Sequence, residues 1–95
     1  MIYELGFLSE ALKEWRGLDS QVRAQFKKKL AERLTDPRVP SAKLSGHKDR
    51  YKIKLRAAGF RLVYEVRDDM VIVVVVAVGK GERDAVYRAA ARRNV

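Results

Sequence analysis

A chain of 95 residues is long enough for one domain with a single core, and we expect residues 1–95 to form one such domain. Its hydrophobic content of 47% is ordinary, whereas a formal net charge of +9 and an isoelectric point near 10.2 indicate an anionic partner. Because cysteine is absent, disulfide frameworks, thiolate nucleophiles and cysteine-based zinc sites are excluded, which fits a cytoplasmic protein.

The positive charge is concentrated in the middle of the chain. Residues 1–19 carry four acidic and two basic side chains, whereas residues 43–67 carry eight Lys and Arg and two acids. Such an excess binds polyphosphates through counterion release, so nucleic acid is the first partner to consider, although an acidic protein or a charged membrane surface would satisfy the same charge. The N-terminus lacks the layout of a signal peptide, and the apolar run 70–78 is too short to cross a bilayer as a helix.

The first third of the chain predicts a strand and two helices. Alternating apolar residues indicate a strand over residues 2–7, and Ser9 suits the cap of a helix that ends near residue 17. Asp19 or Ser20 caps a second helix, which Asp36-Pro37 ends. Its apolar stripe consists of Leu18, Val22, Phe26, Leu30 and Leu34, and its outward face consists of Arg23, Lys27, Lys28 and Arg33.

The remainder predicts a surface connection, three strands and a short helix. Residues 37–50 form the connection, strands 51–56 and 60–66 form a hairpin, and a turn at Asp68-Asp69 leads to a buried valine strand over 70–78. A helix over residues 82–93 closes the chain. We expect an α+β fold in which two N-terminal helices pack on one face of a four-stranded antiparallel sheet, with the short C-terminal helix at its edge.

The predicted hairpin gathers basic side chains on one face. A tight loop at Ala57-Ala58 sets Leu55 opposite Phe60 and Lys54 opposite Arg61, so that one face is apolar. The other face then carries Lys52, Lys54, Arg56 and Arg61. An isolated K-x-K is most often the solvated side of a strand. Here, however, the next strand places Arg61 beside these lysines, and Lys80 and Arg83 follow near the same end of the sheet. This clustering of cations favours an anion-binding site.

These cations suit metal-free cleavage of RNA. The acidic residues are too scattered for a two-metal nuclease, and His47 is a lone surface residue in a loop. The remaining route uses the 2′-hydroxyl of RNA as nucleophile. Neighbouring cations lower the pKa of a lysine, so Lys52 and Lys54 are candidate proton acceptors. Tyr87 offers a ring for base stacking and a hydroxyl that cations would acidify, although its spacing fits packing on the sheet equally well.

The segments YKIKLRAAGFRLVYEV and VGKGERDAVY resemble the RelE toxins of bacterial toxin–antitoxin pairs. The similarity extends through LSEALKEWRGLDSQVRAQFKKKLAERL and AKLSG to essentially the whole chain. It implies a microbial-ribonuclease-like fold, ribosome-dependent cleavage of mRNA in the decoding A site, and a RelB-like antitoxin. By position, Lys52 and Lys54 match the family's catalytic lysines, Arg61 its phosphate-stabilising arginine, and Tyr87 its stacking or proton-accepting tyrosine.

One departure from the family concerns residue 81. The best-known members carry there an arginine that stabilises the transition state or protonates the leaving group, whereas this chain has Gly81, and Arg83 is the nearest substitute. We therefore expect a metal- and cofactor-free mRNA endonuclease that contacts no membrane. The alternatives are a ParE-type gyrase inhibitor and a catalytically weak RNA- or antitoxin-binding variant. Contacts to mRNA and ribosomal RNA are expected from Lys27, Lys28, Lys43, Arg56 and Lys80.

Overall fold

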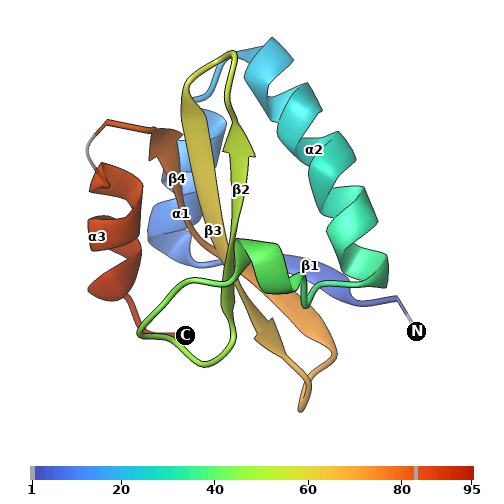
Figure 1. Cartoon of the computed structure of the whole chain (residues 1–95). Helices are drawn as coiled ribbons and strands as arrows, with labels where there is room; N and C mark the ends of the chain where they lie inside the picture. Colours follow the sequence, from blue (N-terminus) through green and yellow to red (C-terminus); the bar gives the residue numbers. More distant parts are fainter. Residues whose placement is uncertain (1, 83) are drawn as a thin grey trace.

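The computed structural model describes residues 2–82 and 84–95 and has the expected α+β class (Figure 1). In chain order the elements are β1 (Glu4–Phe7), α1 (Ser9–Arg16), α2 (Ser20–Thr35), the 3-10 turn η1 (Pro40–Ala42), β2 (Arg50–Leu55), β3 (Phe60–Arg67), β4 (Ile72–Lys80) and α3 (Ala85–Ala91). Within the described ranges, no helix is long and apolar enough to cross a membrane.

The sheet has the strand order β1-β4-β3-β2 and is mixed. Strands β2, β3 and β4 form the expected antiparallel meander, but β1 runs parallel to β4, so the prediction of a purely antiparallel sheet was wrong at this strand. Helices α1 and α2 form a crossover that brings β2 to the far edge in the same direction as β1. After two reversals β4 runs in that direction again, beside β1.

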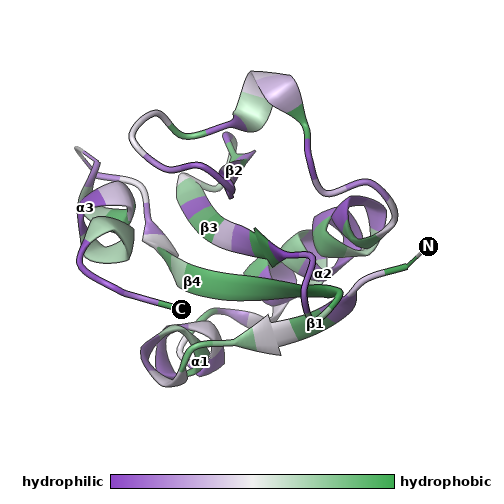
Figure 2. Ribbon diagram, turned by 90° about the horizontal axis from the view of Figure 1, so that it is seen from below, coloured by the Kyte–Doolittle hydropathy of each residue, from purple (hydrophilic) through white to green (hydrophobic). Residues whose placement is uncertain are grey.

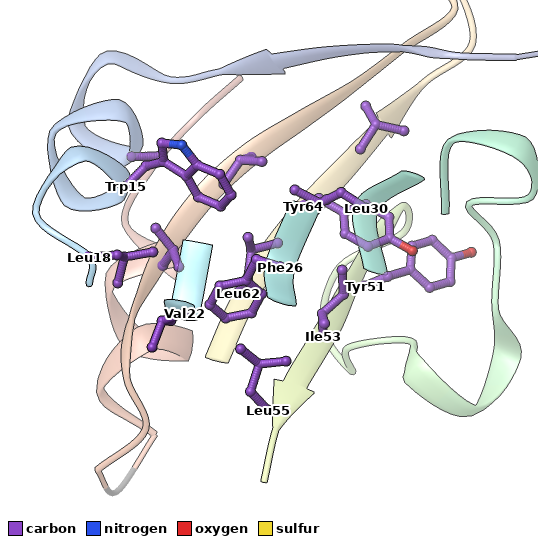
Figure 3. Packing of buried hydrophobic residues seen from close by; sticks show 14 of the residues in the cluster. Trp15, Leu18, Val22, Phe26, Leu30, Tyr51, Ile53, Leu55, Leu62 and Tyr64 are labelled. Atoms are coloured by element: carbon purple, nitrogen blue, oxygen red, sulfur yellow. The ribbon is translucent and has the colours of Figure 1, made fainter. Parts of the chain in front are cut away.

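The main core lies between one sheet face and the helices α1 and α2 (Figure 3). The ring of Trp15 in α1 lies 6.3 Å from that of Phe26 in α2, and both pack in one buried cluster with Leu62 and Tyr64 of β3. The predicted stripe of α2 is confirmed, since Leu18, Val22, Phe26 and Leu30 are buried and Leu34 packs against them half-exposed.

The two predicted helix starts differ in outcome. Asp19 precedes α2, and its carboxylate accepts a hydrogen bond from the Gln21 amide at 3.5 Å, as expected of a cap. Ser9, by contrast, is already the first residue of α1, and Leu8 precedes that helix without a side-chain cap. The Ser9 prediction was therefore wrong by one position.

Helix α3 packs on the opposite face of the sheet, not at its edge as expected. Figures 1 and 2 show the sheet between α2 and α3, with β4 apolar along most of its length. Val86 and Ala90 of α3 pack on Val63, Val76 and Ala77 in a second, smaller cluster. The apolar residues of β4 alternate towards both faces, which is why the strand reads as a continuous hydrophobic run.

Polar contacts fasten the end of α3. Arg50 is only 2% exposed, and its guanidinium donates to Glu65 at 2.8 Å and to the carbonyl oxygens of Ala90 and Arg93 at 2.6 Å each. Arg93 in turn donates to the Glu14 carboxylate of α1 at 2.8 Å. The apolar contact between α3 and the sheet is small, and Arg50 and Arg93 add to it by binding backbone and carboxylate oxygens.

Two predicted boundaries move inward. Strand β4 begins at Ile72, because Met70 is exposed and Val71 has φ of 52°, a left-handed turn conformation that a strand cannot continue. Helix α3 begins at Ala85, after Asp84, whose φ is 62°.

Candidate functional site

The β2–β3 ladder brings Lys54 directly opposite Arg61. The observed register also pairs Leu55 with Phe60, as predicted, and Lys52 with Val63. The connection spans residues 56–59 and closes at Gly59, which has φ of 74°. Alternation along the strands turns Lys52, Lys54 and Arg61 to the face opposite the main core, the face on which α3 packs. Helix α3 covers parts of β3 and β4, and the basic strip formed by Lys52, Lys54 and Arg61 remains half-exposed beside it.

Two shallow hollows meet at Lys54 and Arg56. One, of about 210 Å³, is lined by Lys54, Leu55, Arg56, Gly59, Phe60, Arg61 and Gly81. The other, of about 290 Å³, is lined by Arg33, Ser41, Ala42, Lys52, Lys54 and Arg56. Since most polar groups around both hollows are cationic, the surface suits a chain of phosphates.

The positive charge of the strip lowers the pKa of Lys54. Lys52 lowers the pKa of the Lys54 ammonium, with smaller contributions from partial burial, Arg61 and Arg56. The direction is the one expected from the sequence, because like charges nearby disfavour the protonated form. The lowered pKa means that a larger share of the Lys54 amine is neutral at a given pH than in an isolated lysine.

Tyr87 lies beside the same cations. The Arg61 guanidinium carbon is 5.4 Å and the Lys52 ammonium 6.0 Å from the centre of its ring, within cation–π range. Its hydroxyl is buried and has no hydrogen-bond partner among the described residues. Burial raises the pKa of Tyr87 and outweighs the opposing effect of Arg61, so the expected acidification of the hydroxyl was wrong.

The further basic candidates spread away from the strip. Lys80 is exposed at the end of β4, paired with Phe60 in the ladder. The Lys43 ammonium binds the carbonyl oxygen of Lys48 and lies 5.9 Å from the Tyr51 ring, while Lys27 and Lys28 lie exposed on α2. Arg83, the candidate substitute for the missing arginine, lies outside the described residues.

Sequence reasoning missed two side chains of the site. Arg33, expected to face outward, is half-buried and donates to the Lys52 carbonyl oxygen at 3.2 Å and to the Tyr64 hydroxyl at 2.9 Å. Its spacing of seven from Phe26 already assigns it to the core side of α2. Asp84 lies 3.9 Å from the Arg61 guanidinium, and no local sequence signal pairs the two.

Within residues 2–82 and 84–95, no group of three His, Asp or Glu side chains comes close enough to hold a metal ion. The cations of the described site can bind an anion and stabilise negative charge, and an amine among them can transfer a proton.

Comparison with known proteins decides the family. A family described as "ParE toxin of type II toxin-antitoxin system, parDE" matches residues 5–85. The mRNA interferase toxin RelE of Escherichia coli K12 is 56% identical over 93 residues, covering 98% of each chain. The chain belongs to the RelE toxin family.

Solved structures of RelE proteins have the same fold as this RelE family member. A double Arg-to-Ala variant of E. coli RelE in the free state matches with a TM-score of 0.91 and 54% identity, covering 100% of both chains. RelE from the intact E. coli RelBE toxin–antitoxin complex matches with a TM-score of 0.81 and 58% identity, covering 85% of this chain and 99% of that one.

Proposed function

We propose that this RelE family member, through residues 1–95 as one toxin domain, cleaves mRNA in the decoding A site of cytoplasmic ribosomes and so inhibits translation. The observation that carries the proposal is the pairing of Lys54 with Arg61 on an accessible sheet face next to the Tyr87 ring. A proton acceptor, an anion-binding group and a stacking surface then lie within reach of one nucleotide. Relatives at 56% identity are named mRNA interferases, which supports the same activity.

The proposed step is attack of the ribose 2′-oxygen on the adjacent phosphorus. The neutral amine of Lys54 takes the 2′-hydroxyl proton, the bond from phosphorus to the 5′-oxygen breaks, and the Lys52 ammonium donates a proton to that oxygen. The products are a 2′,3′-cyclic phosphate and a 5′-hydroxyl end. Arg61 binds the phosphate and stabilises the negative charge that develops on it, while Tyr87 orients the nucleotide by stacking.

The route requires no metal, because Lys52 and Arg61 supply the positive charge that a metal ion would otherwise bring to the phosphate. General-base catalysis typically contributes about 10²–10⁴-fold, and one donor to the developing charge about 10²–10³-fold. Arg83 remains a further candidate for that charge-stabilising role.

In this proposal, the basic side chains around the strip bind RNA and take no part in the chemical step. Arg56 borders both hollows of the strip, and Lys43 and Lys80 extend the positive surface along its flanks towards mRNA. The exposed pair Lys27 and Lys28 on α2 faces ribosomal RNA. Such contacts are non-specific and additive, and they make binding salt-dependent.

A RelB-like antitoxin holds the toxin in check. An extended antitoxin segment would cover the basic strip and displace α3, whose apolar contact with the sheet is small. To do so it must break the bonds from Arg50 to the carbonyl oxygens of Ala90 and Arg93, and the pair between Arg93 and Glu14. Structures of RelE with RelB, and with a RelB-derived peptide, support an antitoxin of this kind.

A gyrase-inhibiting activity is the alternative, favoured by the ParE description of the matching family. The deciding experiment is single-turnover cleavage of mRNA on programmed ribosomes, run beside a gyrase supercoiling assay. We expect cleavage by the wild type, a loss of about 10²–10⁴-fold in Lys54→Ala and in Lys54→Arg, and no inhibition of supercoiling. Inhibited supercoiling without cleavage would replace the proposal by the alternative. Equal, undetectable cleavage by all three proteins, with gyrase unaffected, would leave only a binding module.

A further inference from the structure

The larger of the two hollows beside the basic strip, called the edge hollow below, lies at the open edge of the sheet. Strand β2 is an edge strand, with α2 and η1 beside it (Figure 1). The lining comes from all three elements: Arg33 from α2, Ser41 and Ala42 from η1, and Lys52, Lys54 and Arg56 from β2 and the residue after it. Four of these six residues are cationic and none is acidic, so the edge hollow has the electrostatics of an anion site.

Arg33 is oriented at the edge hollow by hydrogen bonds of its own. Its Nη1 donates to the Lys52 carbonyl oxygen at 3.2 Å and to the Tyr64 hydroxyl at 2.9 Å. The Tyr64 hydroxyl donates in turn to the Pro37 carbonyl oxygen at 2.6 Å. Because both bonds of the guanidinium use Nη1, its Nη2 and Nε have no hydrogen-bond partner among the described residues and can donate to a ligand.

The cations around the edge hollow have no carboxylate partners. In the part of the chain that the structure describes, none of the four forms an ion pair with Asp or Glu. Elsewhere buried arginines do pair, as Arg50 does with Glu65 at 2.8 Å. The repulsion among the unpaired cations, with Lys52 as its largest source, lowers the pKa of the Lys54 ammonium. A bound anion would offset that repulsion.

The open edge of β2 adds a neutral donor. In an antiparallel strand, the backbone groups of successive residues point alternately to the two sides of the strand. The Lys52 carbonyl oxygen accepts from Arg33 and so points away from β3, and the amide of Lys54, two residues on, points to the same open edge. Guanidinium, backbone amide and hydroxyl groups are the donors that proteins use for phosphate oxygens, and Ser41 supplies the hydroxyl.

We propose that the edge hollow is a second phosphate-binding site, in which Arg33, the Lys54 amide and Ser41 bind the RNA phosphate on the 5′ side of the attacking ribose. The inference rests on the function proposed above, in which Arg61 binds the scissile phosphate on the 3′ side of that ribose. The two hollows share Lys54 and Arg56, so a nucleotide that places one phosphate in each has its ribose beside Lys54. Holding both phosphates therefore brings the 2′-hydroxyl to the proposed proton acceptor.

The first test measures binding of a short RNA that cannot be cleaved. The probe is a single-stranded tetranucleotide with 2′-fluoro riboses, which lack the attacking hydroxyl, titrated into the free protein at several salt concentrations. We expect Arg33→Gln to raise Kd by about 10-fold and to lower the slope of log Kd against log salt concentration by about 0.7, the value for one contact with a single strand. Loss of a general charge effect alone would change neither quantity so much.

Arg16→Gln is the matched control. It removes the same charge from an exposed position on α1 that borders neither hollow. Its Kd for the tetranucleotide should stay within about twofold of the wild type, since a distant surface charge contributes little. Equal Kd values and equal salt slopes for Arg33→Gln and Arg16→Gln would overturn the proposal.

A second pair of variants leaves the Arg33 hydrogen bonds intact, in case Arg33→Gln does not fold. Ser41 is exposed on η1 at the edge hollow. Ser41→Glu adds a carboxylate that competes with phosphate for the cations, and Ser41→Gln adds the same bulk without charge. We expect Ser41→Glu to bind the tetranucleotide at least about 5-fold more weakly than Ser41→Gln. Equal binding by the two would contradict a phosphate site here.

The position of the phosphate is tested on programmed ribosomes. The mRNA carries one neutral methylphosphonate in place of the phosphate on the 5′ side of the attacking ribose. We expect this change to lower single-turnover cleavage by the wild type about 10-fold and to have little further effect in Arg33→Gln, where the contact is already lost. An equal loss in both proteins would overturn the proposal. Binding of the tetranucleotide that depends on Arg33, without cleavage of any mRNA, would refute the proposed function alone.

Discussion

Lys54 and Arg61 are directly opposite one another in the β2–β3 ladder, on the sheet face away from the main core. A like-charged pair in this position destabilises a sheet by about 0.2–1 kcal/mol, and nothing in the folding of the hairpin requires it. Its effect is to concentrate positive charge and to lower the pKa of the Lys54 ammonium, together with the larger contribution of Lys52. The first prediction concerns that pKa.

The pH dependence of cleavage should follow the Lys54 amine. The neutral amine is the active form, so the rate rises with pH as Lys54 loses its proton. Removing the charge of Lys52 in Lys52→Gln removes the largest cause of the lowered pKa, so the midpoint of the rate profile should move to higher pH. Single-turnover rates between about pH 7 and pH 11 measure the midpoint, since this range includes the ordinary lysine pKa of about 10.4 and lower values.

Lys52→Arg is the control for this shift, because it keeps the positive charge beside Lys54. Its midpoint should stay near that of the wild type, even where its overall rate falls through loss of the proton donor. A profile whose midpoint is the same in Lys52→Gln and in the wild type would show that Lys54 is not the titrating base.

Tyr87 should act through its ring and not through its hydroxyl. The hydroxyl is buried without a partner among the described residues, and burial raises its pKa. Tyr87→Phe should therefore retain cleavage within about threefold and fold as stably as the wild type, while Tyr87→Ala should weaken RNA binding by about 1–3 kcal/mol through lost stacking. Titration of a single-stranded RNA with each variant checks the binding, and equal losses in both variants would assign the role to the hydroxyl.

Arg50 should be important for stability. It is 2% exposed and binds the Glu65 carboxylate and two carbonyl oxygens at the end of α3. Arg50→Met leaves these oxygens buried without their donor and should lower the free energy of unfolding by about 3–5 kcal/mol in urea denaturation. Amide exchange should accelerate first in α3.

Arg92→Met is the control, because Arg92 is exposed at the end of the same helix. It should change the free energy of unfolding by less than about 0.5 kcal/mol. Comparable stability of Arg50→Met and Arg92→Met would mean that the Arg50 contacts do not anchor α3.

The basic face of α2 should affect ribosome binding but not the chemical step. Lys27 and Lys28 are exposed and belong to neither hollow of the strip. The double variant Lys27→Gln, Lys28→Gln should raise the Kd for ribosomes and reduce its salt dependence by the loss of about two cation–phosphate contacts. Its single-turnover rate at saturating ribosomes should equal that of the wild type; a lower rate there would implicate α2 in the chemistry.

Local patterns determined much of the fold. The alternation of apolar and basic residues in 51–56 and 60–66 fixed the hairpin register, since a slip by one residue would bury the lysines. Apolar residues recur at every fourth position from Leu18 to Leu30, and this spacing predicted which side of α2 is buried. The resemblance of the whole chain to RelE toxins then identified the family, which the comparisons confirmed.

Only the tertiary structure decided how separate segments meet. The direction of β1, the packing of α3 on the second sheet face and the contact of Arg61 with Gly81 each join residues distant in the sequence. A periodic pattern states which side of an element is apolar, but not which partner covers that side. That choice, like the burial of the Tyr87 hydroxyl, depends on the close packing of all elements at once.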